Sequence, residues 1–319
     1  DAISQSFSSI DALPRNCPAN ISINFRFAET VKNLCNDCTD IQMVLLYKLL
    51  PMMRSIIEAC DCVSTVQNAC FALQYLLRRV NSETAEALCH YGVLPVLGQC
   101  LTHGKITIVT QALNTLLLFT KCGEERHILE MRHIVCGLYD IISVGTNNKH
   151  VYIAVQCLGE LFGKSPKVIK MVLVHTPDTV DQLVALVDTT PNQSHPTIRS
   201  KACIRTLMKG LRCASSEQLD SFRGVFQLSF EVMLAYIKDF PLLSDVLDTL
   251  VMVLPKLSHA VSIEELTEQE GWLKVAKLEL IVDCMRNGEQ RGRAAALARK
   301  VTRLLHIART LKLIPIDFP

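Results

Sequence analysis

One segment of the chain has the residue types of a phosphate-binding loop. Gly159, Gly163, Lys164 and Ser165 occur in the order of the P-loop motif, in which backbone N–H groups cradle phosphates. Three residues separate the two glycines, whereas the motif requires four, and the segment ends an apolar helical stretch instead of following a strand. We therefore expect no nucleotide site there.

Four cysteines resemble the ligand set of a tetrahedral zinc site. Cys35 and Cys38 form one pair, and Cys60 and Cys62 form the other. The apolar stretch between the pairs is typical of one helix. At the helical rise per residue, that helix would hold the pairs about 25 Å apart. Only a sharp break at Pro51 would bring them together, so we expect no metal site.

Histidines and carboxylates form no catalytic set in the sequence. His127 and His133 do not have the spacing of a metalloprotease helix, in which two histidines lie four residues apart. No Ser/His/Asp set and no pair of carboxylates can be placed together. We expect a chain that is not an enzyme, with no cofactor and no small-molecule substrate.

Four basic residues have the spacing of one helix face. Lys201, Arg205, Lys209 and Arg212 are separated by 4, 4 and 3 residues, and no acidic residue occurs from position 189 to position 216. A solvated outer stripe is one interpretation of this pattern. A site for an acidic peptide or for the phosphates of RNA is the other.

A second basic cluster, which includes Arg299 and Arg303, occupies the last segment of the chain. It accompanies an apolar face of Leu297, Val301 and Leu304. The last repeat of a stacked array needs a polar outer face. We therefore favour a capping role for this cluster over contact with RNA.

These residues belong to helices that repeat along the chain. A small or short apolar residue, an aliphatic residue, two variable residues and a leucine recur five times, with starts 40, 45, 46 and 43 residues apart. Positions i, i+1 and i+4 share one helix face, so each marker motif predicts a buried stripe. The central aliphatic residues of the five marker motifs are Leu73, Leu113, Leu158, Ile204 and Leu247.

Each later marker motif follows another apolar helix and a break. Residues 92–101 precede the second copy and end at a turn around Gly104, whereas residues 180–187 precede the fourth and end at Pro191. A short polar opening such as Ser215-Ser216-Glu217 then begins a further short helix. The period is therefore three helices in about 43 residues.

Three helices per period resemble the armadillo repeat or its relative, the HEAT repeat. The most specific segment is Gly92–Leu101, which looks like the second armadillo helix with its Gly, aliphatic and Pro residues at the start. The resemblance covers about residues 28–312 and implies an all-α, right-handed α-solenoid. We expect six units, at 28–80, 81–122, 123–164, 165–213, 214–258 and 259–312, after an irregular arm at 1–27 and before a tail at 313–319.

The resemblance also implies where a partner would bind, because the third helices of armadillo proteins line a groove. In the importin-alpha branch, these helices carry a Trp and, four residues later, an Asn. The matching positions here contain no Trp/Asn pair, so a nuclear-localisation-signal receptor of that type is not expected. The groove positions that the resemblance implies are Phe71, Tyr75, Gln111, Thr115, Gln156, Glu160, Ala202, Thr206, Asp245 and Thr249.

The composition of the chain indicates the kind of compartment and partner to expect. The chain has 319 residues, 49 % of them hydrophobic, and a formal charge of +2, so no overall field draws it to nucleic acid or to a membrane. No apolar run reaches the length of a membrane span. The 14 cysteines occur singly in apolar stretches, which favours a reducing intracellular compartment, the cytoplasm first and an organelle such as the mitochondrion second. Asp1 fits either a truncated or a processed N-terminus.

The sequence therefore predicts a scaffold or adaptor that binds a protein partner, as a subunit of a larger complex. The alternative is a helical-repeat subunit of a ribonucleoprotein that touches RNA through the two basic clusters. A third interpretation is a structural subunit of a cytoskeletal or ciliary assembly. The low number of aromatic residues favours the protein-binding scaffold over the RNA-binding subunit, because platforms for base stacking are lacking.

Overall fold

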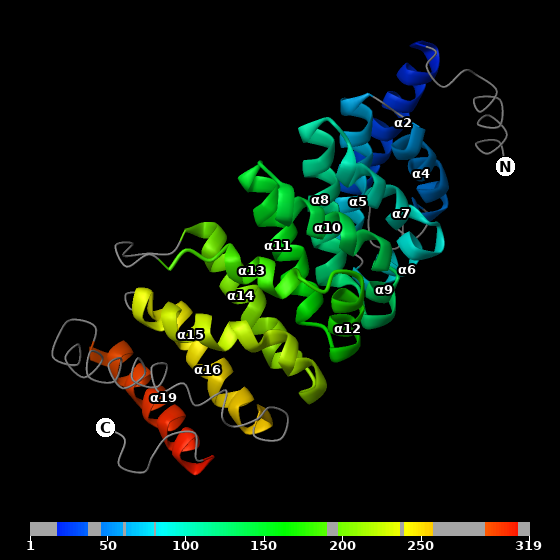
Figure 1. The fold of residues 1–319 in the computed structure, drawn as a ribbon. Helices are drawn as coiled ribbons and strands as arrows, with labels where there is room; N and C mark the ends of the chain where they lie inside the picture. Colours follow the sequence, from blue (N-terminus) through cyan, green and yellow to red (C-terminus); the bar gives the residue numbers. More distant parts are fainter. Residues whose placement is uncertain are drawn as a thin grey trace. The chain divides into compact units, whose positions relative to one another are not determined.

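The computed structural model describes residues 18–37, 46–59, 62–79, 81–189, 197–236, 239–257 and 291–311. Every regular element in these ranges is a helix, as predicted (Figure 1). None of these helices is both long and apolar enough to cross a membrane. The chain divides into two compact units, Asp1–Cys157 (unit 1) and Leu158–Pro319 (unit 2), and the boundary falls within one helix.

Unit 1 opens with α2 (Pro18–Asp37), η1 (Tyr47–Leu49), α4 (Leu50–Ala59) and α5 (Val63–Arg79). Sets of a short first helix, a second helix and a long third helix follow. The first set is α6 (Asn81–His90), α7 (Val93–Gln99) with η2 (Cys100–Thr102), and α8 (Ile106–Cys122). The second is α9 (Glu125–Leu129), α10 (Arg132–Val144) and α11 (Asn148–Phe162), and α11 contains the boundary between the units.

Unit 2 repeats the same order. One set is α12 (Pro166–His175), α13 (Thr179–Ala185) and α14 (Ile198–Cys213), and the next is η3 (Ser216–Phe222), α15 (Arg223–Ala235) and α16 (Phe240–Leu257). The last described helix is α19 (Arg291–Thr310). The period of three helices that the sequence predicts is thus present in both units.

Capping residues set where several first and third helices begin. The Ser165 hydroxyl accepts a hydrogen bond from the Val168 N–H at 3.4 Å, and Pro166 occupies the first turn of α12, where its missing N–H costs nothing. Thr197 caps α14 in the same way. The predicted N-cap at Ser215 is confirmed, because its side chain and that of Gln218 form a capping box.

The long third helices stack on one another within each unit. In unit 1, α2 packs on α5 and α5 packs on α8; in unit 2, α14 packs on α16 and α16 packs on α19. The marker motifs supply the contact faces. Their five central residues are all buried, with Leu73, Leu113, Leu158 and Leu247 at 0 % exposure and Ile204 at 1 %.

The prediction of an irregular arm over residues 1–27 is wrong for its last ten residues, since α2 begins at Pro18. Apolar residues alternate at Ile21, Ile23, Phe25 and Phe27, which is not a helical period. The helix is held instead by packing of its later turns on α5, where Ala28, Val31 and Cys35 are buried. Tertiary contact therefore overrides the local pattern.

A glycine allows the closest packing in unit 2. A Cβ atom on Gly210 of α14 would lie 2.7 Å from Phe222 and 2.9 Å from Phe162. These two rings meet edge to face with centroids 5.8 Å apart, and both are fully buried. By contrast, a Cβ atom on Gly224 of α15 would meet nothing within 4 Å.

We predict that Gly210→Ala is less stable to unfolding than Gly224→Ala by about 1–3 kcal/mol, the cost of overpacking a core. Both substitutions replace a helical glycine by alanine, and only the one at Gly210 meets a packed core. Urea denaturation of the two variants and the parent measures it. Equal stability of the two variants would contradict the packing described for Gly210.

The cysteines differ in burial more than the sequence predicts. Five of the ten described cysteines are buried and Cys136 is exposed, because it lies on the outer face of α10. Burial raises the pKa of Cys70 and Cys203 to about 12. In contrast, the hydroxyl and then the backbone N–H of Thr65 favour the thiolate of Cys62 and lower its pKa.

Because the thiolate is the nucleophile, we predict that iodoacetamide at pH 8 modifies Cys62 of the native protein well before Cys70 or Cys203. Peptide mass spectrometry after timed quenching measures the order. In urea the three thiols should react alike, which serves as the control. Early modification of Cys70 or Cys203 in the native state would contradict their burial.

Candidate partner-binding surface of the third helices

The third helices of unit 1 are connected by side-chain amides and hydroxyls. The Gln74 amide of α5, which is 4 % exposed, donates to Gln111 Oε1 and to Thr115 Oγ1 of α8, each at 3.2 Å. On the next pair of helices, the Thr110 hydroxyl of α8 and His150 Nε2 of α11 are 2.7 Å apart. These hydrogen bonds fix the register of α5, α8 and α11.

Some of these contacts follow the marker motifs. At two of the four junctions, the residue after the central aliphatic residue of one motif contacts the residue before the last apolar residue of the next. Gln74 and Thr115 meet in this way, and in unit 2 a Cβ atom on Gly159 would lie 2.6 Å from Thr206 Oγ1. Asp248, which follows the central residue of the fifth motif, forms an ion pair with Lys300 of α19.

Uncharged polar and aromatic side chains lie half-exposed along these helices of unit 1. We call them the amide stripe; they are Phe71 and Tyr75 on α5, Gln111 and Asn114 on α8, and Tyr152 and Gln156 on α11. The Gln156 amide N–H donates to Tyr152 OH at 2.9 Å, and Gln111 accepts from Gln74. The Asn114 amide makes no hydrogen bond to any described residue.

The predicted groove positions differ in their exposure. Phe71, Tyr75, Gln111, Gln156, Glu160, Ala202 and Asp245 are half-exposed. Thr115, Thr206 and Thr249 are not, at 0 %, 2 % and 0 % exposure, so the prediction that they face a groove is wrong. Their short side chains lie in the contacts between neighbouring third helices, where Thr115 and Thr249 also donate to backbone carbonyls four residues earlier.

In unit 2 the third helices are connected by ion pairs. Lys209 of α14 lies 3.0 Å from Glu160 of α11, and Lys201 lies 2.6 Å from Asp239, which precedes α16. Arg212 pairs with Asp245 of α16 and donates from Nε to Thr249 Oγ1 at 2.8 Å. With the pair of Lys300 and Asp248, these contacts form what we call the ion-pair ladder.

The ion-pair ladder overturns the prediction that the basic stripe is uncompensated. Acidic partners are absent from positions 189–216, but Glu160, Asp239 and Asp245 reach Lys209, Lys201 and Arg212 from elements packed against α14. Arg205 is exposed and makes no ion pair with a described residue. Three of the four cations thus hold helices together and are not available to a partner.

The second basic cluster agrees with a capping role as far as it is described. Leu297, Val301 and Leu304 of α19 are buried within unit 2, while Arg299 and Arg303 are exposed.

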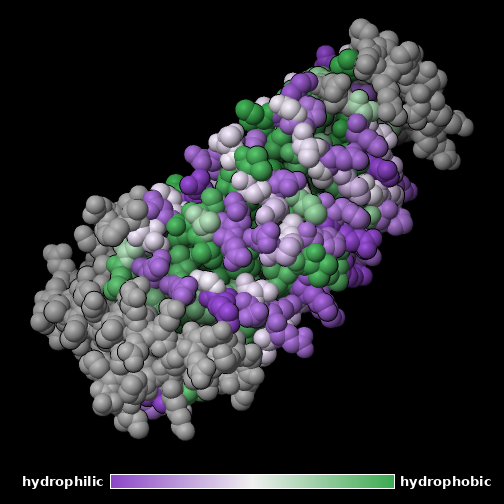
Figure 2. Space-filling view, in the orientation of Figure 1, coloured by the Kyte–Doolittle hydropathy of each residue, from purple (hydrophilic) through white to green (hydrophobic). Residues whose placement is uncertain are grey.

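Figure 2 shows hydrophilic and hydrophobic residues intermixed over the visible described surface.

The structure places the P-loop-like residues on a helix end. Gly159 lies within α11 against Thr206, and Glu160 is bound to Lys209, so these residues form a helix contact. Of the zinc-like cysteines, Cys38 and Cys60 lie outside the described residues. His127 is buried and closes a capping box with Glu124, and burial is the main cause that lowers its pKa.

Sequence reasoning missed several residues of this surface. Asn114 and Tyr152 were not considered, although each lies three or four residues from a predicted position on the same helix face. Asp239 and Asp248 were missed because their partners are far away in sequence, and Lys300 was assigned only to the second basic cluster. The spacing of the marker motifs was the available signal, since it sets which residues of successive third helices meet.

Comparison with known proteins supports the repeat. Residues 81–117, which cover α6, α7 and most of α8, match the family model of the armadillo/beta-catenin-like repeat. This span includes Gly92–Leu101, the segment on which the resemblance was based. None of the curated proteins compared with the chain by sequence matches it.

Solved structures similar to the chain include engineered repeat proteins. An engineered protein matches with a TM-score of 0.63 and 14 % identity, over 82 % of this chain and 97 % of its own. A computationally designed armadillo repeat protein for modular peptide recognition matches with a TM-score of 0.61 and 13 % identity, over 81 % and 99 %. A designed armadillo repeat protein in complex with the peptide (KR)4 matches with a TM-score of 0.60 and 14 % identity, over 81 % and 98 %.

We predict that Lys209→Glu lowers the free energy of unfolding by about 1 kcal/mol, because it places two carboxylates together where a half-exposed ion pair stands. Adding Glu160→Lys should restore most of the loss. Urea denaturation of both single variants and the reversed pair measures the coupling. Additive effects of the two substitutions would contradict a direct contact between these side chains.

Proposed function

We propose that this chain, an armadillo-type helical-repeat solenoid, is a non-enzymatic binding protein that holds an extended segment of a partner protein on its amide stripe. The observation that carries the proposal is the Asn114 amide. It is half-buried on α8 between the neighbouring third helices, and it makes no hydrogen bond to a described residue. A half-buried amide without an internal partner can gain about 0.5–1.5 kcal/mol when a ligand replaces water as its hydrogen-bond partner.

Amide side chains suit the backbone of an extended peptide. An Asn or Gln amide offers both a donor and an acceptor, which match the C=O and N–H groups of a chain that forms no secondary structure of its own. Packed helices lie about 8–10 Å apart. An extended chain that crosses them would meet a new helix every two or three residues.

The aromatic residues of the amide stripe add apolar contact area. Phe71 and Tyr75 are half-exposed on α5, and Tyr152 is half-exposed on α11. None of the six side chains is charged, so the central part of the bound segment should be uncharged too. An uncharged segment also avoids the desolvation cost of a charge that finds no partner.

The fold supports this use of the third helices. One designed armadillo repeat protein with this fold is in complex with the peptide (KR)4. The amide stripe has no carboxylate for such a basic peptide, so the partner proposed here differs in composition. The RNA interpretation depended on the two basic clusters, and three of the four cations of the first are ion-paired.

We predict that a 12-residue peptide, selected against the protein from a random displayed library, binds about tenfold more weakly to Asn114→Ala and to Tyr75→Ala. The loss of one satisfied amide or one aromatic anchor has this magnitude. Fluorescence anisotropy with the labelled peptide gives the dissociation constants.

Gln99→Ala is the matched control, because Gln99 is an exposed amide of unit 1 on the second helix α7. It should leave the dissociation constant unchanged. Urea denaturation of each variant separates loss of binding from loss of folding. A selected peptide that binds all three variants like the parent would exclude the amide stripe as the site.

A further inference from the structure

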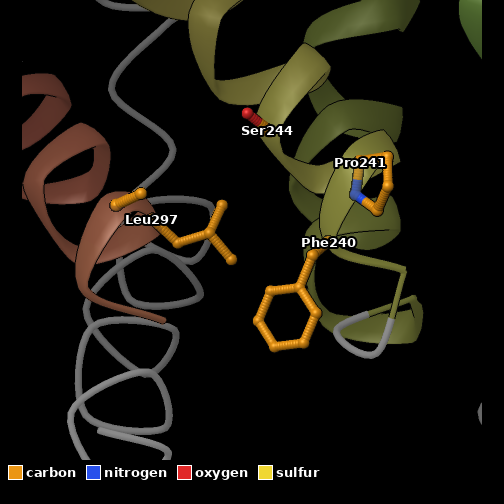
Figure 3. A pocket seen from close by; sticks show the side chains of 5 residues that line it. Phe240, Pro241, Ser244 and Leu297 are labelled. Atoms are coloured by element: carbon orange, nitrogen blue, oxygen red, sulfur yellow. The ribbon is translucent and has the colours of Figure 1, made fainter. Parts of the chain in front are cut away.

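A small cavity opens between the last two described third helices of unit 2. Phe240, Pro241 and Ser244 of α16 and Ala296 and Leu297 of α19 line it, and its volume is about 290 Å³. Figure 3 shows the side chains of Phe240 and Leu297 pointing toward one another across it. The volume of the cavity is close to the lower limit for pockets that bind small organic ligands.

The cavity has apolar walls and one polar side. Ser244 lies one helical turn after Phe240, and its Oγ atom accepts a hydrogen bond from Lys300 Nζ at 2.6 Å. Lys300 also pairs with Asp248. The ammonium group has three N–H donors, and the described residues take two of them.

One hydrogen-bond donor therefore remains on the lining of the cavity. It is the Ser244 O–H, which no described residue accepts, whereas Lys300 touches Ser244 and is not a lining residue. The charge of Lys300 is already balanced by Asp248, whose carboxylate would repel a second anion. The polar side thus favours a neutral acceptor, such as an amide carbonyl, over a carboxylate.

We propose that this cavity is an anchor site for one apolar residue of a partner peptide, with the side chain between Phe240 and Leu297 and a backbone carbonyl that accepts from the Ser244 hydroxyl. The volume fits one side chain and its amide. The single hydroxyl donor lies beside an ion pair whose charges are already balanced, and this selects the neutral carbonyl of an internal peptide residue over a free carboxyl end. The site is separate from the amide stripe and does not depend on it.

The test uses N-acetyl-phenylalaninamide, which has an apolar side chain and only neutral carbonyls. For a ligand of this size we expect a dissociation constant on the order of 1 mM. Titration into the full chain with labelled methyl groups should give a saturable shift of the Leu297 methyl signals. N-acetyl-phenylalanine, which carries a free carboxylate, should bind several-fold more weakly.

Ala296→Leu fills the cavity and should abolish the shift. Ala295→Leu is the same change on the neighbouring residue, which does not line the cavity, and should preserve it. Ser244→Ala should weaken binding several-fold. No saturable shift up to 20 mM, as a rough upper limit, or equal loss of binding in both leucine variants, would overturn the proposal. Equal binding of the amide and the carboxylate would overturn the assignment of a neutral backbone carbonyl.

Discussion

The described helices bury their apolar faces against one another, and the stacking of successive third helices is the constraint on which the other features depend. The stacking brings neighbouring backbones close. Gly159 faces Thr206 at a distance that leaves no room for a Cβ atom, and Gly210 lies against Phe222 and Phe162 in the same way. Such contacts fix both the spacing and the register of the helices, so the polar residues beside them meet fixed partners.

The same register serves two purposes in the two units. In unit 2 the meeting residues are of opposite charge, and Glu160, Asp245 and Asp248 each neutralise a cation on a neighbouring third helix. Much of the charge of these helices is thereby used inside the protein. In unit 1 the meeting residues are uncharged, with Gln74 bound to Gln111 and Thr115, and the Asn114 amide makes no hydrogen bond to a described residue. This difference places the proposed site on unit 1.

The repeat could be predicted from the sequence because apolar spacing within one helix is a local property. Leu73, Leu113, Leu158, Ile204 and Leu247 were identified from that spacing, and all are buried. The state of the basic stripe could not be predicted, because Lys209 and Glu160 are 49 residues apart and only the stacking brings them together. The burial of Thr206 follows from the glycine opposite it, which a single helix does not reveal. The start of α2 was missed because its packing on α5 outweighs an alternating apolar pattern.

The structure of the protein bound to a selected peptide tests the central claim most directly. The account predicts an extended peptide that crosses α5, α8 and α11, with main-chain groups hydrogen-bonded to Asn114 and Gln111 and side chains against Phe71 and Tyr75. A peptide that lies on the first or second helices, such as α6, α7 or α10, would contradict it. So would a peptide bound only to the cations of α14.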